Sequence, residues 1–418
     1  MSKLNFFSLL NQEVANIDEA KTSKRNEKVI EKFTSDQSPK AIINGREIRI
    51  FNSNDYLGLR HHPSMKEAEH NASQTFGTGP GAVRFISGSL QIYTELEEKI
   101  ASFHHREAGM IFSSAFATNL AVLFCLIKGQ TKNTVVDPDV LVISDALNHR
   151  SIIDGIRIAN LPSENKAIFN HLDTDHLEQI LKENLGKYKR VLIITDGVFS
   201  MLGEYQKLKE VRRVVNEYDS QYELGTLLIV DDAHGVGIAG KTGRGTEEVE
   251  EVQADVLIGT FGKAFGADGG YVVANREIIQ YLRESAATYI YSNPFSPGTA
   301  GAALQALHLI DQKVGKNLLE KSKENTEYFK KQMSEAGFKF AAQSSHPIQP
   351  ILIGDPEKTQ LLTAKLFEKN VLVTQISYPV VPQGRDEIRA QISAAHTKED
   401  LDYVIQQFKD IANEMKLL

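Results

Sequence analysis

Short apolar runs alternate with helical patterns through the middle of the chain. Between residues 51 and 295 the runs VLVISDA, RVLIITDG, TLLIVDDAH, DVLIGTF and YVVAN are rich in β-branched residues, and segments such as LKEVRRVVNEY lie between them. Continuous apolar strands that alternate with helices are typical of a parallel sheet covered on both faces. The pattern therefore predicts an α/β fold in which residues 51–295 form a large domain with a mostly parallel sheet.

The two ends of the chain have different patterns. Residues 1–50 are expected to form an N-terminal arm, a helix followed by a short strand pair in AIINGREIRIF, where the NG step favours a hairpin turn. After SNPFSP, long helical stretches precede the runs IQPILIG, VLVTQISYP and EIRAQIS, so residues 296–418 are expected to form a smaller α+β domain. Thr397 can cap the last helix, with Asp400 in its first turn. The apolar face of that helix contains Leu401, Val404, Ile405, Phe408, Ala412 and Met415.

Composition narrows the class of protein. With 418 residues, 41% hydrophobic and 24% charged, the chain has the composition of a folded globular protein with more than one domain. The formal charge of -7 is spread without long single-sign blocks, so we expect no nucleic-acid surface. We also expect no membrane span and no targeting segment, and therefore a cytoplasmic protein. Cys125 is the only cysteine, which excludes an internal disulfide, and its apolar neighbours favour core packing.

Two strands of the predicted large domain end in residues that suit catalysis. The run LLIVDDAH contains Asp231 and His234, and Lys263 follows the next strand in TFGKAFG. Because ligands gather at the carboxyl ends of parallel strands, we expect these three side chains to share one crevice. Lys263 lies among glycines and small residues, in a tight loop where desolvation lowers the pKa of an amine, and Schiff-base chemistry requires such an amine. The sequence therefore predicts a pyridoxal-phosphate enzyme.

A pyridoxal ring needs an acid beside its pyridine nitrogen, because the protonated ring stabilises a carbanion. Asp231 suits this role, although strand-end capping or turn formation would also explain Asp231 and Asp232, and one of the two is expected to do only that. His234 follows closely enough to contact the ring oxygen. The cofactor phosphate favours the backbone N–H groups of a helix start, together with hydroxyls. The residues predicted to bind it are Ser114, Ala115 and Phe116, which open an apolar helical pattern, and Thr260.

Two other kinds of site are weaker. Gly235, Gly237 and Gly240 spell the dinucleotide pattern GxGxxG after a strand, but no apolar-faced helix follows in KTGRGTEEVEE. The adjacent histidine pairs at 61–62 and 104–105 lack the spacing of zinc ligands, so we expect them at the surface. We therefore expect neither a dinucleotide cofactor nor a metal ion.

With these residues in hand, the chain resembles the α-oxoamine synthases, which are pyridoxal-phosphate transferases of fold-type I. The matching segments are SNDYLGL at 53–59, SDALNHRSIIDGIR at 144–157, TDGVFSMLG at 195–203, VDDAHGVG at 230–237, TFGK at 260–263 and IYSNPFSP at 290–297. The resemblance implies a sheet of about seven mostly parallel strands. It also implies an acyltransferase that condenses an amino acid with an acyl thioester.

The same resemblance implies catalytic roles for four residues and a supporting role for a fifth. Lys263 would form the internal aldimine, Asp231 would pair with the ring nitrogen, and His149 would stack on the ring. His234 and Ser200 would contact the ring edge that has the phenolic oxygen.

The resemblance also implies which residues bind the substrates and which residues contact a partner subunit. Asn54 and Arg389 would hold the amino-acid carboxylate, for which a bidentate guanidinium is physically suited. Ser292 and Asn293 would reach the phosphate in a neighbouring subunit, which implies a homodimer with shared active sites. Arg84, in GTGPGAVRFISG, fits a loop near the acyl thioester, where it would meet the pantetheine or its phosphates.

Different segments of the chain resemble enzymes of this family that use different substrates. SDALNHRSIIDG and SYPVVPQGRDEIRAQISAAHT resemble the glycine C-acetyltransferases, which implies glycine, acetyl-CoA and a reversible step of threonine degradation. Phe261 in TFGK is instead associated with 8-amino-7-oxononanoate synthases. The alternative is therefore a synthase that joins serine or alanine to a longer acyl chain on CoA or acyl carrier protein, as in that enzyme or in serine palmitoyltransferase. A noncatalytic binding protein on the same fold would require the loss of Lys263 or Asp231, and both are present.

Overall fold

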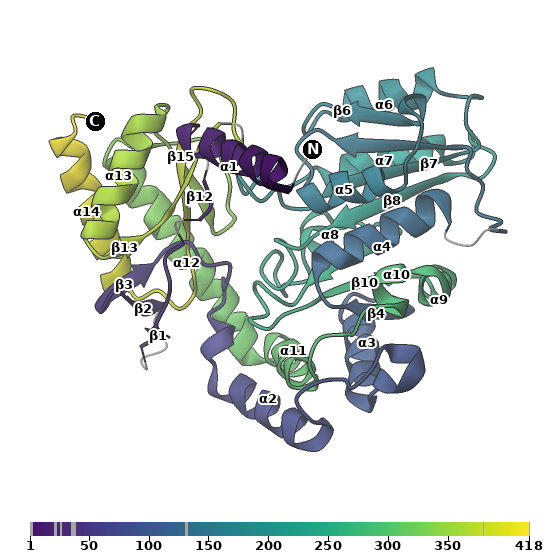
Figure 1. The fold of residues 1–418 in the computed structure, drawn as a ribbon, viewed down its shortest axis with the longest axis horizontal. Helices are drawn as coiled ribbons and strands as arrows, with labels where there is room; N and C mark the ends of the chain where they lie inside the picture. Colours follow the sequence, from purple (N-terminus) through teal and green to yellow (C-terminus); the bar gives the residue numbers. More distant parts are fainter. Residues whose placement is uncertain are drawn as a thin grey trace.

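The structure is a computed structural model of the chain. It describes residues 3–20, 23–25, 27–34, 39–129, 133–378 and 380–417. Parts of the predicted N-terminal arm, and Pro379 in the segment SYPVVPQGRDEIRAQISAAHT, lie outside the described residues. Over the described ranges the strands form three sheets, which belong to two bodies that lie side by side in Figure 1.

The larger body contains a seven-stranded sheet in the order β4-β10-β9-β8-β7-β5-β6. Neighbouring strands from β9 to β6 are parallel, whereas β10 runs antiparallel to both β9 and β4. The predicted α/β fold with a mostly parallel sheet is therefore confirmed. The strands are β4 (Ala108–Phe112), β5 (Val140–Asp145), β6 (Lys166–Phe169), β7 (Arg190–Asp196), β8 (Thr226–Asp231), β9 (Val256–Thr260) and β10 (Gly270–Ala274).

Alternate side chains of this sheet enter two separate cores. In β7, for example, Val191 and Ile193 belong to one core, and Leu192 and Ile194 belong to the other. Helices cover both cores, which explains why the strands read as continuous apolar runs. The first core is covered by α3 (Gln91–Phe103), α6 (Thr174–Glu183), α7 (Leu208–Asp219) and α11 (Pro297–Ile310). The second is covered by α4 (Ala115–Lys128), α5 (Arg150–Ile158) and α9 (Arg276–Ser285), and Cys125 of α4 is buried there as expected.

Further helices and helical turns complete the larger body. They are the α-helices α2 (Pro63–Phe76), α8 (Thr246–Glu250) and α10 (Ala287–Ile290), the single helical turns η1 (Leu59–His61) and η3 (Ser163–Asn165), and the π-helical η2 (Arg84–Gly88). The GxGxxG segment forms turns after β8 rather than a helix start.

The smaller body is an antiparallel sheet covered by three long helices. Its strands follow the order β11-β12-β15-β14 and comprise β11 (Lys339–Phe340), β12 (Ile348–Leu352), β14 (Thr374–Ile376) and β15 (Glu387–Gln391). The helices are α12 (Lys313–Glu335), α13 (Pro356–Glu368) and α14 (Lys398–Glu414). The predicted capping box of Thr397 and Asp400 begins α14, and its apolar face packs into a core with Ile388 and Ala390 of β15.

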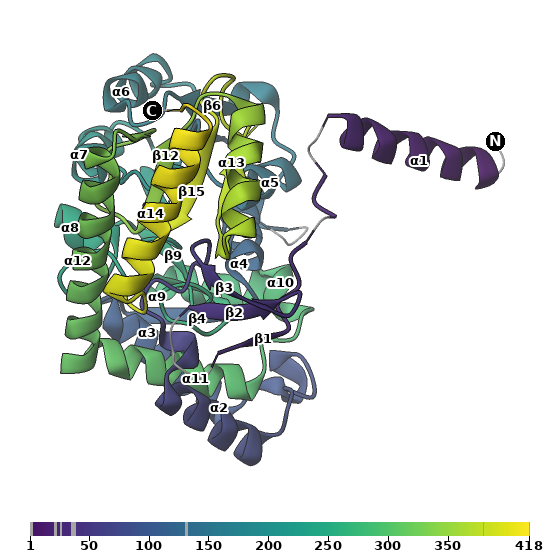
Figure 2. The same cartoon turned by 90° about the vertical axis from the view of Figure 1, so that its left-hand side faces the viewer.

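The N-terminal strands join this smaller body. The expected hairpin is present as β2 (Lys40–Ile43) and β3 (Arg46–Ile50), and β1 (Lys32–Phe33) pairs with β2. The outer edge of β3 pairs in parallel with β13 (Val371–Leu372), because an unpaired strand edge leaves backbone groups unsatisfied. By contrast, α1 (Lys3–Glu19) extends away from both bodies, with every residue exposed (Figure 2).

Helix α11 begins the segment expected to form the C-terminal domain, but it packs on α2 and α3 of the larger body. Its glycines allow this close approach, since a Cβ on Gly301 would lie 2.6 Å from the Ala68 carbonyl oxygen of α2. The long helix α12 follows and connects the two bodies (Figure 1). No helix among the described residues is both long and apolar enough to cross a membrane, and the cytoplasmic location stays a prediction.

Candidate active site

Three carboxylates lie where neighbouring parallel strands of the large sheet end. Asp145, Asp196 and Asp231 are the last residues of β5, β7 and β8, and Asp196 lies directly opposite Asp231 in the strand register. A hollow lies against the ends of β7 and β8, at the sheet edge where ligands of parallel α/β sheets bind. It is lined by Ala115, Phe116, His149, Ser151, Asp196, Val198, Ser200, Asp231, Ala233, His234 and Lys263. The structure therefore brings seven of the fourteen predicted site residues together in the lining of one hollow.

Lys263 occupies the tight loop between β9 and β10. The Gly266 N–H donates to the Lys263 carbonyl at 2.9 Å, and Gly266 has a φ of +67°, where its missing Cβ avoids the backbone of Arg60. Phe261 and Phe265, on either side, are fully buried. Burial lowers the pKa of the Lys263 amine to about 8, although Asp231 acts in the opposite direction. An amine with a lowered pKa in a small hollow is suited to react with an aldehyde.

The two adjacent acids after β8 have different surroundings. The Asn119 side chain donates to Asp231 Oδ2 at 2.5 Å, and the Ala233 N–H donates to Oδ1 at 3.0 Å. These bonds fix the Asp231 carboxylate within the hollow. Asp232 instead accepts bonds from the Thr246 N–H at 2.7 Å and its hydroxyl at 2.6 Å. Asp231 is thus the acid available to a ligand, and Asp232 has the structural role that was the alternative.

His234 is held by a tyrosine from a distant part of the chain. Its Nδ1 lies 2.8 Å from the Tyr56 hydroxyl, and its backbone carbonyl accepts a bond from His346 Nε2, also at 2.8 Å. Burial and the charge of Lys263 lower the pKa of His234 well below its usual value, so the ring is neutral. With Nδ1 engaged, Nε2 is the ring nitrogen that can contact a ligand in the hollow.

His149 lies at the start of α5. The Ser151 N–H donates to its Nδ1 at 3.3 Å, and its own N–H donates to Asp196 Oδ2 at 2.8 Å. Its side chain is exposed at the hollow, in a position to cover a flat ligand. Desolvation lowers the pKa of His149, so a neutral ring is available for stacking. The Asp196 carboxyl that accepts the His149 N–H is itself buried near the Asp231 charge, and both effects raise the pKa of Asp196 well above its usual value.

The start of α4 forms the end of the hollow expected to hold a phosphate. Ser114 caps the helix by accepting the Ala117 N–H at 3.1 Å, and Ala115 and Phe116 line the hollow. The Thr260 hydroxyl donates to the Gly269 carbonyl at 2.8 Å, so its proton is used within the lysine loop. The backbone N–H groups of the 14-residue helix α4 are therefore the main anion-binding feature on this side.

The predicted carboxylate-binding residues lie on the smaller body and on the loop after β3. Arg389, on β15, contributes to the electrostatic environment of both Lys263 and His234. Its Nε is buried and has no hydrogen-bond partner among the described residues. Asn54 accepts bonds from the Gln391 side chain and, at 3.3 Å, from the Tyr56 hydroxyl. An unpartnered guanidinium beside the lysine is suited to bind a carboxylate.

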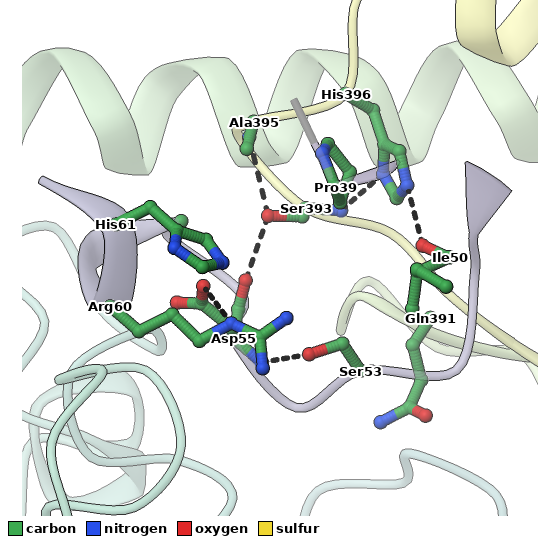
Figure 3. A pocket seen from close by; sticks show the side chains of 11 residues that line it. Pro39, Ile50, Ser53, Asp55, Arg60, His61, Gln391, Ser393, Ala395 and His396 are labelled. Carbon is green, nitrogen blue, oxygen red and sulfur yellow. Dashed lines mark hydrogen bonds and ion pairs between the residues drawn. The ribbon is translucent and has the colours of Figure 1, made fainter. Parts of the chain in front are cut away.

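The loop that contains Asn54 is anchored to the smaller body. Figure 3 shows the neighbouring Asp55, whose N–H donates to Ser53 Oγ at 3.2 Å and whose carbonyl accepts the Ser393 hydroxyl at 2.7 Å. Arg60 Nε lies 3.4 Å from the Asp55 carboxylate. Burial raises the pKa of Asp55 to about 6 despite this partner. The Ser393 contact holds the segment SNDYLGL against the smaller body.

Arg84 forms a buried ion pair. It is 6% exposed, and its two terminal nitrogens each donate to one carboxylate oxygen of Glu97 at 3.1 Å. A buried guanidinium requires such a carboxylate, since an unpaired charge is costly away from water. The Arg84 guanidinium is therefore engaged by Glu97, and its contact with the pantetheine or its phosphates stays a prediction.

Two further expectations have different outcomes. His104 was expected at the surface, but it is buried and its Nε2 lies 2.9 Å from the Tyr271 hydroxyl, because apolar surroundings of α3 and β10 enclose it. Ser292 and Asn293 lie outside the lining of the hollow, in the loop after α10. Their contact with the site of a partner subunit stays a prediction.

The geometry fits pyridoxal phosphate. The hollow contains a buried amine, a fixed carboxylate for the ring nitrogen, a neutral imidazole at its lining and a helix start for the phosphate. All these groups come from the carboxyl ends of parallel strands or the loops that follow them, where ligands of such sheets bind. Fold and site together define a pyridoxal-phosphate transferase of fold-type I.

Comparison with known proteins agrees with this class. Residues 46–408 match the profile of the family described as aminotransferase class I and II. The chain is 37% identical over 386 residues to the 8-amino-7-oxononanoate synthase of Thermoanaerobacter pseudethanolicus. This match covers 92% of each of the two chains. It is 38% identical over 393 residues to the enzyme of that name from Symbiobacterium thermophilum, which covers 93% of this chain and 94% of the relative. A solved serine palmitoyltransferase with its pyridoxal-phosphate internal aldimine superposes with a TM-score of 0.87 at 25% identity over all of both chains.

The chain belongs to the aminotransferase class I and II family and, within it, to the α-oxoamine synthases, whose cofactor is pyridoxal phosphate. The recognition of this family from sequence is confirmed. Enzymes of this group join an amino acid to an acyl thioester. The relatives named above support the alternative prediction of an 8-amino-7-oxononanoate synthase better than the prediction of a glycine C-acetyltransferase.

Several residues of the site were not identified from sequence. Asp196 ends a strand just as Asp231 does, and TDG after an apolar run was an available signal. Tyr56 and Asn119 lie far from Asp231 and His234 in sequence, and their hydrogen bonds depend on the folded chain. No local pattern distinguishes such residues from ordinary core or helix positions.

Proposed function

We propose that the chain catalyses the decarboxylative condensation of alanine with a seven-carbon acyl thioester that ends in a carboxylate. The product named for the relatives, 8-amino-7-oxononanoate, has its amino group on the carbon next to a terminal methyl. Cleaving the bond between its C7 and C8 gives an aminoethyl unit, which is alanine without its carboxylate, and a seven-carbon acyl group. The main support is identity of 37–38% with such synthases over more than nine tenths of the chain.

The residues of the hollow suit this reaction. Pyridoxal phosphate, when bound, supplies the aldehyde that captures the amino group and the ring that stabilises a carbanion at Cα. Lys263 holds the cofactor and, once released, moves the proton at Cα, for which a pKa of about 8 is suitable. Asp231 holds the proton on the ring nitrogen. Arg389 and Asn54 orient the carboxylate of the amino acid, which determines the bond at Cα that breaks.

His149, His234 and Ser200 support the same ring. His149 covers one face of the ring, and His234 contacts its oxygen through Nε2 while Tyr56 fixes Nδ1. Ser200 lies in the lining of the hollow, where its hydroxyl contacts the same edge. The start of α4 binds the phosphate through the N–H groups of Ala115 and Phe116.

The test is a substrate panel on the purified holoenzyme, with thiol release as the assay. Alanine, glycine and serine are each offered with acetyl-CoA, palmitoyl-CoA and the seven-carbon carboxyacyl thioester on CoA or acyl carrier protein. We expect alanine with the carboxyacyl thioester to have a kcat/KM at least about 100-fold above that of glycine with acetyl-CoA. Faster turnover of glycine and acetyl-CoA would instead support a glycine C-acetyltransferase. Lys263→Ala is the inactive control.

We also propose that the active form is a homodimer. Phe116 lines the hollow and Tyr291 precedes Ser292, and both are large exposed apolar residues that a second subunit would cover. Ser292 and Asn293 would then reach the phosphate of the partner's cofactor. Mass photometry should give twice the chain mass of 46.5 kDa, and Asn293→Ala should weaken cofactor retention without changing that mass.

A further inference from the structure

A fully buried carboxyl group lies near the substrate-binding face of the smaller body and has no role in the proposed reaction. Glu387, the first residue of β15, is 0% exposed. Neither of its carboxyl oxygens has a hydrogen-bond partner among the described residues. Buried carboxyl groups nearly always have such partners, so an unpartnered one calls for a functional explanation.

Strand geometry relates Glu387 to the arginine of the site. Residues two apart on a strand point to the same face and lie about 7 Å apart, so Glu387, Arg389 and Gln391 share one face of β15. The opposite face, with Ile388 and Ala390, packs into the apolar core. Arg389 Nε is also buried and unpartnered among the described residues. Two complementary groups without partners thus lie side by side on this face.

The remaining neighbours of Glu387 are few. Its cross-strand partners are Leu352 on β12 and Ile376 on β14, and both are apolar. The charged groups that act on it are Arg389, Arg385 in the turn before β15, and Glu204 in the loop after β7. Burial raises the pKa of Glu387 to about 8, because it outweighs the two arginines. The side chain is therefore a neutral acid at pH 7 and a carboxylate above about pH 8.

We propose that Glu387 is a positioning residue that acts as an internal competitor for Arg389, so that its protonation state determines how freely Arg389 binds the amino-acid carboxylate. When Glu387 is protonated, the guanidinium turns to the substrate. When Glu387 is ionised, the guanidinium pairs with it, and the substrate carboxylate must displace that partner. The inference rests on the proposed role of Arg389 in binding the substrate.

The sign of the effect follows from this competition. Because the competing carboxylate forms only as pH rises through the pKa of about 8, the amino-acid KM should rise at alkaline pH while kcat is unaffected by this group. Amino-acid binding above pH 8 should return a proton to Glu387. The ionisation of the substrate amine also affects KM, but it does so equally in every variant.

The experiment compares the parent holoenzyme with Glu387→Gln, which keeps the shape of the side chain and removes its ionisation. The KM for alanine is measured from pH 6.5 to 9.5, with Glu357→Gln, an exposed glutamate of α13, as the matched control. We expect the ratio of the parent KM to the Glu387→Gln KM to rise about tenfold over this range. The control should follow the parent, and kcat should be the same in all three.

A second measurement does not depend on turnover. Calorimetry of alanine binding at pH 8.5 in two buffers of different ionisation heat gives the number of protons taken up. The parent should take up more protons than Glu387→Gln, and the control should match the parent. If Glu387→Gln folds poorly, Glu387→Met serves in its place, since its unbranched apolar side chain suits Leu352 and Ile376.

The results separate this inference from the proposed function. If Arg389→Ala leaves the alanine KM unchanged, the proposed role of Arg389 is wrong. If Arg389→Ala raises KM but Glu387→Gln keeps the pH profile and the proton uptake of the parent, the role of Glu387 alone is refuted. The role of Glu387 is also refuted if the KM for alanine depends on pH in the same way in the parent, in Glu387→Gln and in Glu387→Met.

Discussion

Replacing Lys263 by methionine should make the cofactor-free protein more stable. The half-buried Lys263 side chain lies in the loop between β9 and β10, and desolvation lowers the pKa of its amine from 10.5 to about 8. At neutral pH the Lys263 amine is therefore protonated in the folded protein, although its charge is poorly solvated. Methionine has a similar length and removes that charge, so the substitution exchanges activity for stability, as is common at functional sites.

The magnitude follows from the two pKa values. The lowering of the Lys263 pKa from 10.5 to about 8 corresponds to about 3 kcal/mol, and this destabilisation of the folded parent is fully present at pH values below 8. Between the folded and unfolded pKa values the unfolded chain binds more protons, so the stability of the parent rises with pH. At pH 9.5 the remaining destabilisation is about 1 kcal/mol. With a typical unfolding entropy per residue, 1 kcal/mol moves the Tm of this chain by about 1 °C.

Thermal unfolding of cofactor-free Lys263→Met and parent at pH 6.5 and 9.5 is the assay. The variant should melt about 3 °C higher at pH 6.5 and about 1 °C higher at pH 9.5. Lys241→Met, at an exposed lysine, should show neither the increase nor its pH dependence. A variant that melts below the parent at pH 6.5, or a difference that does not shrink with pH, would refute a buried amine of lowered pKa.

Three other predictions test separate features. Asp231→Asn should lower kcat roughly 100-fold or more in the thiol-release assay, because a neutral amide cannot hold the ring proton. Arg84→Met should lower stability by about 2 kcal/mol in denaturant unfolding, because Glu97 loses two charged hydrogen bonds but keeps its ion pair with Arg283, while the acyl-thioester KM stays unchanged. Burial lowers the pKa of His171, but hydrogen bonds to Asp145 and Glu204 outweigh it and raise that pKa to about 9. Its stabilising effect is therefore full below pH 6.5 and is lost as pH rises through 9, and His171→Asn should abolish this slope in Tm between pH 6 and 9.5.

Local patterns predicted the reactive centre well. Lys263 and Asp231 follow apolar strands directly, and the carboxyl ends of neighbouring strands necessarily meet at one edge of a parallel sheet. The strand pair before residue 51 was also predictable, because its turn signal is local. Its attachment to β13 was not, since that pairing joins segments more than 300 residues apart.

Arg84 illustrates the opposite situation. Its glycine-rich surroundings predict an exposed loop, but its ion pair with Glu97 depends on how α3 packs. Glu387 is similar, because the sequence EIRAQIS shows a strand but not the complete burial of its first side chain. Whether a charged residue is exposed, paired or isolated depends on neighbours that are distant in sequence.

The sequence by itself therefore determined the α/β sheet, the reactive lysine, its acid and the cofactor, because each depends on strand periodicity and on residues that directly follow strands. Only the tertiary structure decided which groups fix those residues and which arginine is free. It placed Tyr56 against His234, Asn119 against Asp231, and Arg389 near Lys263 with Glu387 beside it. The physical reason is that hydrogen bonding and desolvation depend on contacts across the two bodies, and no local pattern records them.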